Sequence, residues 1–285
     1  MKSLLVKSYA KINICLNVVG KREDGYHELD MIMLPLEMHD SMIIKNLGTK
    51  VENNFVTIDD FSMGPLTYNL ATLAIEKLAA KSGFNEKFMV TIHKVIPMQS
   101  GLGGGSSNAA HTLVGINKLL HLGLSDDELI EIGKPLGADI PFFVIDKPAR
   151  CRGIGEKLDF ITVKNDYYCL IVKPAQGCST KGVYEVSDTM NLHIGDVEKV
   201  LQALETGDDD LLAESIFNSL EAPAISLVPE IQVIKDKLFA LGLKIVQMSG
   251  SGSAVFALST DKKLIKQAFK ALDKEYLVEM TKILK

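Results

Sequence analysis

A glycine-rich segment between a predicted strand and a predicted helix most restricts how this chain can fold. Alternating apolar residues predict a strand at 88–92, and apolar residues at helical spacing predict a helix at 109–120. Between them, four glycines fall within 101–105 and two serines follow at 106–107. Glycines let the backbone approach a ligand closely, and the amides that begin a helix attract anions. We therefore predict that this segment holds a phosphate group.

This glycine segment matches neither of the two common phosphate-binding motifs. No Gly-Lys-Ser/Thr follows, as a Walker A loop requires, and GxGxxG counted from Gly101 meets Ser106 where the third glycine belongs. A dinucleotide oxidoreductase is also disfavoured because no acid ends a strand about 20 residues later. A flexible linker or a simple helix N-cap remains an alternative, although neither needs so many glycines.

Length and charge limit the class of protein. The 285 residues suffice for one large or two ordinary domains, and 47% hydrophobic with 24% charged residues is typical of a soluble globular chain. The formal net charge of -5 provides no general cationic field. We therefore expect no nucleic-acid partner and no membrane partner.

The cysteines and the N-terminus indicate a cytoplasmic protein. The four cysteines form no CxxC pair and no regular framework, which suits a reducing compartment. Lys7 and Lys11 interrupt what would otherwise be the apolar core of a signal peptide. No stretch approaches the roughly 18 consecutive apolar residues of a membrane-spanning helix.

Several common catalytic patterns are missing from the sequence. The six histidines show neither HExxH nor another compact metal-ligand spacing, so we expect no permanent metal site. The GxSxG elbow of many hydrolases and the HRD and DFG motifs of protein kinases do not occur either.

The first half of the chain mixes strands and helices. Alternation at 9–18 predicts a strand with one polar face, and the turn dipeptide Asp24-Gly25 leads to a second extended run at 26–36, so the chain should open with a β-hairpin. A helix is expected at 69–81, and Ser125 is a suitable N-cap for another.

The second half predicts a different order of elements. Strands at 169–173, 244–248, 254–258 and 276–284 alternate with helices in the order β-α-β-β-α-β, with additional helices in the first crossover. This is the order of a ferredoxin-like unit. We predict an α+β protein of two domains, residues 1–150 and 151–285.

Two charged residues are candidates for catalysis. Lys11 lies on the polar face of the first strand beside Asn13, where it could neutralise a phosphoryl group or could simply be solvated. Asp139 precedes an apolar run and could act in catalysis or cap a helix. The segment Ser249-Gly-Ser-Gly252 is either a turn between strands or a second anion-binding loop.

Taken together, four segments resemble the ordered motifs of the GHMP kinases. They are AKINICLNVVGKREDGYHEL at 10–29, PMQSGLGGGSSNAA at 97–110, LGADIPFF at 136–143 and MSGSGSAVF at 248–256. Within that superfamily the chain is most similar to the members that phosphorylate 4-diphosphocytidyl-2-C-methyl-D-erythritol. The resemblance extends over nearly the whole chain.

The resemblance implies an N-terminal domain of the ribosomal S5 domain 2-like type and a C-terminal ferredoxin-like domain, with the active site between them. It also implies ATP-dependent phosphorylation of the 2-hydroxyl of this cytidine diphosphate derivative, a step of the non-mevalonate isoprenoid pathway. Asp139 would be the general base on that hydroxyl. Lys11 would orient Asp139 and stabilise developing charge.

The same resemblance implies two sets of binding residues. The ATP set is Asn69, Lys94, Pro97, Met98, Gln99, Ser100, Gly101, Leu102, Gly103, Gly104, Gly105, Ser106 and Ser107. The substrate set is Asn13, Tyr26, His27, Thr180 and Tyr184, with Tyr184 stacking on the cytosine and His27 bonding its edge. Mg²⁺ is expected only with ATP, near Ser106 or Ser107.

The sequence departs from the family pattern at a few positions. Gln99-Ser100 replaces two small residues, Ser253-Ala254 replaces Gly/Pro-Thr, and Tyr184 stands where Phe is common. Three other functions stay open: a mevalonate-type kinase, a homoserine-type kinase, and a nucleotide-binding regulator without turnover. We expect a monomer or a weak homodimer.

Overall fold

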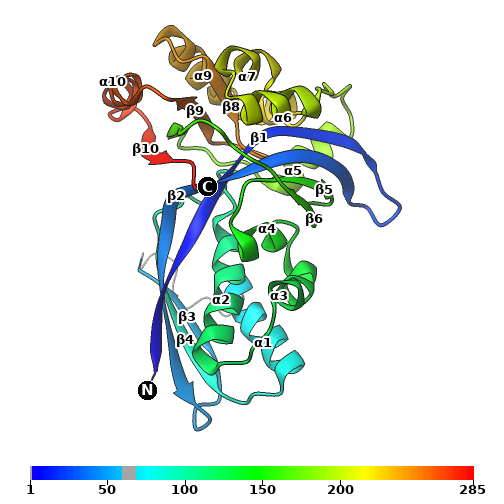
Figure 1. Ribbon diagram of the computed structural model, residues 1–285, viewed down its shortest axis with the longest axis vertical. Coiled ribbons are helices and arrows are strands. Elements are labelled where there is room, and N and C mark those ends of the chain that lie inside the picture. The colour runs from blue at the N-terminus through cyan, green and yellow to red at the C-terminus, as the bar shows by residue number, and fades with distance from the viewer. Residues whose placement is uncertain (1, 60–68) are drawn as a thin grey trace. The chain divides into compact units, whose positions relative to one another are not determined.

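The computed structural model describes residues 2–59 and 69–285, and the chain forms two compact units (Figure 1). Unit 1 consists of Met1–Ala10, His39–Ile96 and Gly103–Asp146, and unit 2 consists of Lys11–Met38, Pro97–Leu102 and Lys147–Lys285. The chain therefore passes between the units several times. The domain limits 1–150 and 151–285 stay predictions.

Unit 1 is built on strands that pair in the order β3, β4, β2, with β1 also paired to β2. β4 (Lys87–His93) runs antiparallel to the second half of β2 (His27–Gly48) and parallel to β3 (Phe55–Ile58). Phe88, Val90 and Ile92 are completely buried, as the alternating pattern predicts. β1 (Ser3–Lys21) begins in this unit and continues in unit 2.

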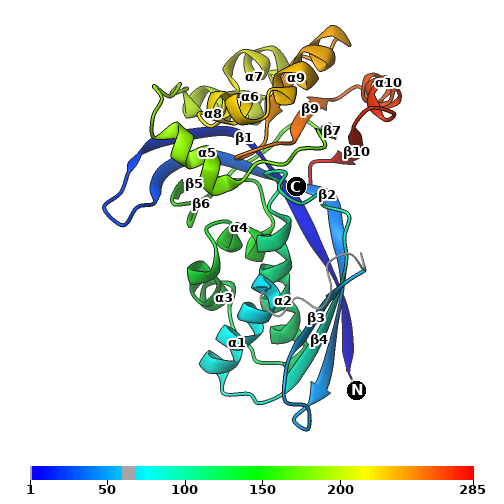
Figure 2. The same ribbon diagram turned by 180° about the vertical axis from the view of Figure 1, so that it is seen from behind.

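The helices of unit 1 lie on one side of its strands in both views (Figures 1 and 2). They are α1 (Leu70–Ser82), α2 (Gly104–Leu120), α3 (Asp126–Gly133), a 3₁₀ turn (Lys134–Leu136) and α4 (Ile140–Ile145). The predicted cap of α3 is confirmed, because the Ser125 side chain accepts from the Glu128 amide and the Glu128 carboxylate accepts from the Ser125 amide.

Unit 2 contains the predicted hairpin. β1 and β2 pair on either side of a turn in which Gly25 has a φ of 85° and Asp24 accepts a hydrogen bond from the amide of Tyr26. The first half of β2 continues the sheet through β5 (Ala149–Gly153), which pairs in turn with β6 (Lys157–Phe160). The strands are longer than the predicted runs, but their pairing is confirmed.

A second sheet in unit 2 confirms the predicted ferredoxin-like order. Its strands lie in the order β10, β7, β9, β8, and every neighbouring pair is antiparallel. The strands are β7 (Tyr168–Lys173), β8 (Ile245–Met248), β9 (Val255–Ser259) and β10 (Leu277–Lys282).

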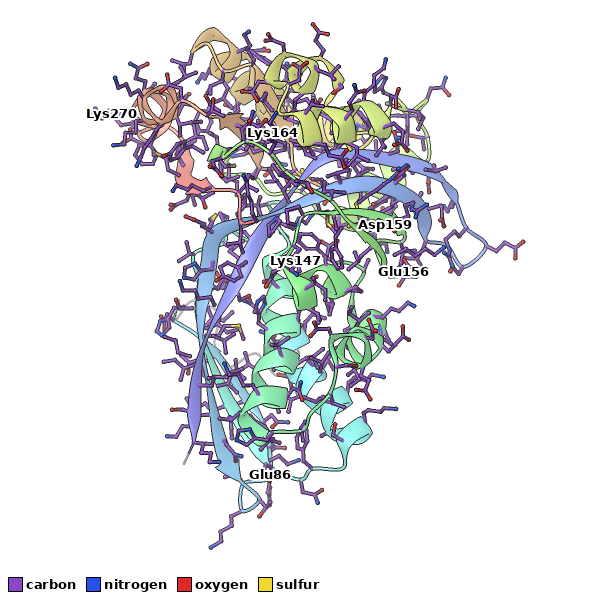
Figure 3. All side chains as sticks on the ribbon, in the orientation of Figure 1. Glu86, Lys147, Glu156, Asp159, Lys164 and Lys270 are labelled. Carbon is purple, nitrogen blue, oxygen red and sulfur yellow. The ribbon has the colours of Figure 1, made fainter. Side chains whose placement is uncertain are left out.

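Six helices of unit 2 complete this half of the fold. They are α5 (Thr180–Ser187), α6 (Val197–Thr206), α7 (Asp209–Ser215), α8 (Glu221–Leu227), α9 (Glu230–Ala240) and α10 (Lys262–Leu272). α10 buries Ile265, Ala268 and Leu272, whereas Lys270 points outward (Figure 3). Within the described ranges, no helix is both long and apolar enough to cross a membrane.

A hydrogen-bonded aspartate–histidine pair lies at the end of α4 in unit 1. Asp146 follows this helix with a φ of 53°, and its Oδ2 lies 2.9 Å from Nε2 of His111 on α2. Among the described residues, its other oxygen, Oδ1, has no hydrogen-bond partner and is buried. Burial therefore raises the pKa of the Asp146 carboxyl.

Asp146→Asn should change how stability depends on pH. Because the folded-state pKa lies above the unfolded value, the native state holds this proton more tightly, and wild type should lose stability as pH rises from about 3.8 toward the folded-state pKa. Asparagine cannot ionise and tolerates a positive φ. The free energy of unfolding of the variant minus that of wild type, measured with denaturant at several pH values, should therefore increase as the pH rises through this range. A difference that is constant with pH would contradict this explanation.

Candidate functional site

Two polar residues of β1 form a buried pair in unit 2. Lys11 and Asn13 are only 4% and 1% exposed, and the Lys11 ammonium donates to Asn13 Oδ1 at 2.5 Å. Alternation along the strand places both side chains on one face, as the sequence predicts. Lys11 is therefore not a solvated strand lysine, and a buried charge of this kind needs polar partners such as Asn13.

Two loops meet on this part of β1. The amide of Lys11 donates to the carbonyl of Leu102 at 3.1 Å, and the amide of Asn13 donates to Ser249 Oγ at 3.3 Å. The Ser249 hydroxyl in turn donates to the carbonyl of Gly101 at 3.1 Å. The first part of the glycine segment, residues 97–102, and the loop 249–252 are thus joined to the strand that carries Lys11.

The backbone of Gly101 lies directly against the Ser249 carbonyl. Gly101 has a φ of 75°, and a Cβ atom placed on it would overlap the Ser249 oxygen and lie 3.0 Å from the Gly252 nitrogen. Among the residues that the structure describes, Gly105, in contrast, has only a Leu70 methyl group within 4 Å, at 3.9 Å. Packing thus requires glycine at 101, whereas glycine at 105 leaves open space beside the backbone.

The unusual pair Gln99-Ser100 bonds Cys178 and the segment after the loop 249–252 through its main chain, while the Ser100 hydroxyl donates to the Pro97 carbonyl at 2.6 Å. The Gln99 carbonyl accepts from the amides of Cys178 and Ser253, each at 3.3 Å, and the Ser100 carbonyl accepts from the Ala254 amide at 3.1 Å. Gln99 adopts a φ of 51°, a conformation that favours glycine. Because main-chain atoms make these bonds, the side chains of Gln99 and Ser100 can differ from the family pattern without breaking the connection to the loop 249–252.

Helix α5 carries two of the residues expected on the substrate side. The Thr180 hydroxyl lies 3.0 Å from the Ser251 hydroxyl, and the Tyr184 ring stacks on His27 with centroids 4.7 Å apart and planes inclined by 24°. Residues four apart lie on one face of a helix. Tyr26, the neighbour of His27, is 60% exposed. The structure therefore brings Thr180, Tyr184 and His27 to one side of α5.

Lys94 and Asn69, the two residues expected beside adenosine, make contacts within unit 1 that hold nearby main chain in place. The Lys94 ammonium lies 2.5 Å from Oδ2 of Asp40, which is completely buried and also accepts from the amides of Val95 and Ile96 at 2.8 Å each. Asn69 caps α1 by accepting from the Ala71 amide at 2.7 Å. Both side chains therefore have structural partners, and their place beside adenosine stays a prediction.

The helix that follows the glycines begins without a side-chain cap. Gly103 occupies the N-cap position of α2 and has no side chain to satisfy the first amides. Ser107 is completely buried and accepts from the Ser8 hydroxyl at 2.8 Å, whereas Ser106 is half-buried. An anion could therefore meet the uncapped amides of α2, and Ser106 is the more accessible of the two serines.

Asp139 begins α4 in unit 1 but does not cap it. It occupies the N-cap position, with Pro141 in the first turn, yet its side chain makes no capping hydrogen bond. The carboxylate is half-buried. Helix capping does not account for an acid at this position, and its role as a general base paired with Lys11 stays a prediction.

Asn218 is a site residue that the sequence analysis missed. Its amide nitrogen donates to the carbonyls of Met248 and Gly250, at 2.9 and 2.8 Å, and its oxygen accepts from the Leu220 amide. This buried side chain therefore holds the loop 249–252 in place. No local pattern signals a contact between residues so far apart in sequence. Among the described residues, no three His, Cys, Asp or Glu side chains form a metal-binding group.

Comparisons with known proteins match both halves of the chain. The N-terminal domain model of the GHMP kinases matches residues 69–147, and the C-terminal model of the same family matches residues 200–278. A 4-diphosphocytidyl-2-C-methyl-D-erythritol kinase of Bacillus cereus (strain B4264) is 38% identical over 260 residues, covering 90% of this chain and 88% of the relative. The Bacillus pumilus (strain SAFR-032) protein of the same name is 35% identical over 286 residues, covering 97% and 96%.

Solved structures give the same result for the fold. A crystal structure of 4-(cytidine 5'-diphospho)-2C-methyl-D-erythritol kinase has a TM-score of 0.82 and 30% identity, covering 99% of this chain and all of that one. A homoserine kinase from Cytophaga hutchinsonii ATCC 33406 has a TM-score of 0.76 at 17% identity, covering 100% of this chain and 95% of that one. The second comparison supports the fold alone.

Alanine substitutions at Gly101 and Gly105 should separate packing from ligand binding. Gly101→Ala forces a side chain against the Ser249 carbonyl and should lower the free energy of unfolding by about 2 kcal/mol. Gly105→Ala meets open space and should leave stability unchanged or slightly higher, but its methyl group should weaken ATP binding about ten-fold. Denaturation and ATP titration of both variants measure this. Equal effects of the two substitutions on stability would contradict the assignment.

Proposed function

Because this chain belongs to the GHMP kinases, and within them to the family of 4-diphosphocytidyl-2-C-methyl-D-erythritol kinases, we propose that it phosphorylates the 2-hydroxyl of that compound with ATP. The observation that carries the proposal is the buried Lys11–Asn13 pair joined to both the glycine segment and the loop 249–252. A kinase needs a fixed cation and amides that can hold phosphates. Unit 2 supplies the cation at Lys11, and unit 1 supplies the uncapped amides of α2.

The proposed chemistry depends on charge held in fixed positions. Phosphoryl transfer spreads negative charge over the equatorial oxygens, and a buried ammonium such as that of Lys11 stabilises it without needing to reorganise. Asn13 holds the ammonium, so its position does not depend on the substrate. The uncapped amides of α2 would hold the ATP phosphates.

Asp139 is the proposed general base. We assign its carboxylate to accept the proton of the 2-hydroxyl as that oxygen attacks the γ-phosphorus and the bond from the γ-phosphorus to the β-phosphate oxygen breaks. ADP leaves, and the acceptor becomes a 2-phosphate. This assignment is supported by the position of Asp139 in its motif.

Mg²⁺ is proposed to enter with ATP. When bound, it would neutralise charge on the phosphates. Ser106 fits this role better than Ser107, because Ser107 is completely buried and its hydroxyl accepts from Ser8. A cytoplasmic location and a monomeric or weakly dimeric state belong to the same proposal. So does the absence of nucleic-acid partners, which the net charge of -5 supports.

The acceptor is tested by ADP release from Mg-ATP. The purified protein should release ADP with 4-diphosphocytidyl-2-C-methyl-D-erythritol and give a product heavier by one phosphate, but should not do so with mevalonate, homoserine or no acceptor. Release with mevalonate or homoserine instead would assign the chain a different acceptor. Binding of ATP without release in any mixture would indicate a nucleotide-binding regulator.

Asp139→Asn should reduce kcat about 10²- to 10⁴-fold, because the amide cannot accept the hydroxyl proton. The affinity for ATP should remain near wild type, since the base contacts the acceptor. Steady-state kinetics and ATP titration measure the two quantities on protein shown to be folded. Retention of ordinary turnover would exclude Asp139 as the base.

Tyr184→Ala should raise the KM for the cytidine substrate about ten-fold while leaving the KM for ATP unchanged, because a stacking surface for the base is lost. Tyr184→Phe is the matched control and should retain most of the affinity, since the ring remains. An unchanged KM in the alanine variant would make Tyr184 a packing residue only.

A further inference from the structure

Asp188 joins two side chains at the end of α5 in unit 2. Its Oδ1 lies 2.7 Å from Nε2 of His27, and its Oδ2 lies 2.5 Å from the ammonium of Lys21. These hydrogen bonds, from Lys21 first and then from His27, hold the pKa of the Asp188 carboxyl below its usual range. The carboxylate therefore faces His27 in its ionised form, which can only accept hydrogen bonds.

This contact determines which nitrogen of the neutral His27 ring carries the proton. Because the carboxylate accepts and cannot donate, Nε2 must be protonated, and Nδ1 is then left as an acceptor. The His27 side chain is only 10% exposed, and Tyr184 stacks on its face, so the ring has a fixed orientation. Within the part of the chain that the structure describes, Nδ1 makes no hydrogen bond.

We propose that Asp188 is a positioning residue that fixes the tautomer of His27 and so makes the enzyme prefer cytosine to uracil in its acceptor. The proposal rests on the proposed function and adds the residue that determines base selectivity. Cytosine presents an amino group where uracil presents a carbonyl oxygen. The amino group can donate to Nδ1 of His27, whereas a carbonyl oxygen would face it as a second acceptor. A site with such a mismatch rejects the wrong base strongly.

Lys21 determines which end of the side-chain amide would face His27 in Asp188→Asn. The Lys21 ammonium only donates, so it should retain the amide oxygen of the new asparagine and leave the NH₂ group facing His27. Nε2 of His27 must then accept, and the proton moves to Nδ1. The substitution should therefore reverse the tautomer of His27, so that Nδ1 donates and uracil is no longer rejected.

The tautomer can be read directly from the nitrogen resonances of the His27 ring. In the full-length protein, at a pH where the ring is neutral, proton–nitrogen spectra should show Nε2–H in wild type and Nδ1–H in Asp188→Asn. The resonances are assigned by their loss in His27→Gln. Nδ1–H in wild type, or Nε2–H in the variant, would overturn the proposal without reference to turnover.

Selectivity is measured as the ratio of kcat/KM for the cytidine acceptor to that for its uridine analogue. Asp188→Asn should lower this ratio about ten-fold or more, with the KM for ATP and kcat at saturating cytidine acceptor unchanged. Asp188→Glu should retain part of the preference for the cytidine acceptor, because its carboxylate still accepts a hydrogen bond from His27. Asp210→Asn is the matched control, since Asp210 forms an exposed ion pair with Lys244 at 2.8 Å and contacts no histidine among the described residues.

A double-mutant cycle separates the tautomer from general damage. In a His27→Gln background, Asp188→Asn should cause no further loss of selectivity, because the group on which it acts is gone. Independent, additive losses would overturn the proposal, and so would an unchanged ratio in Asp188→Asn. If wild type phosphorylates neither the cytidine acceptor nor its uridine analogue, the proposed function is wrong and the selectivity proposal is wrong with it. If wild type is active but Asp188→Asn leaves the ratio of kcat/KM values unchanged, only the role of Asp188 is wrong.

Discussion

The close approach of the Gly101 backbone to the Ser249 carbonyl is the constraint on which the site depends. A side chain at Gly101 would separate the glycine segment from the loop 249–252. The Ser249 hydroxyl, which bonds both the Gly101 carbonyl and the Asn13 amide, would lose its position. Asn218 supports the loop from the other side by binding the Gly250 carbonyl. The Lys11 charge is therefore placed by backbone contacts among three separate stretches of chain.

The site residues of unit 2 divide into two groups with different physical tasks. Around Lys11, buried polar contacts fix a cation, and fixed charge favours stabilisation of a transition state. Around α5, an aromatic stack and a carboxylate fix the orientation of His27, which favours recognition of a flat, hydrogen-bonding base. Thr180 and Tyr184 belong to the same helix, so α5 links the loop 249–252 to the residues proposed to recognise the base.

Local patterns allowed much of the fold and part of the site to be predicted. Alternation identified β4, helical spacing identified α1 and α2, and the order of strands in the second half identified the ferredoxin-like sheet. The contacts of Asn218 with Gly250 and of His27 with Asp188 left no such signal, because they join residues 32 and 161 positions apart. Hydrogen bonds between distant segments have no period in the sequence. They became visible only when the fold brought the segments together.

The position of the new phosphate on the product tests the central claim most directly. Carbon 2 of the acceptor carries a methyl group and no hydrogen, so a phosphate on its oxygen has no proton three bonds away. A proton-coupled phosphorus spectrum of the product should therefore show a new phosphomonoester resonance without splitting by protons. A doublet or triplet would place the phosphate on a neighbouring carbon that bears hydrogen, and no new monoester resonance would mean no transfer to this acceptor. Either result would contradict the account.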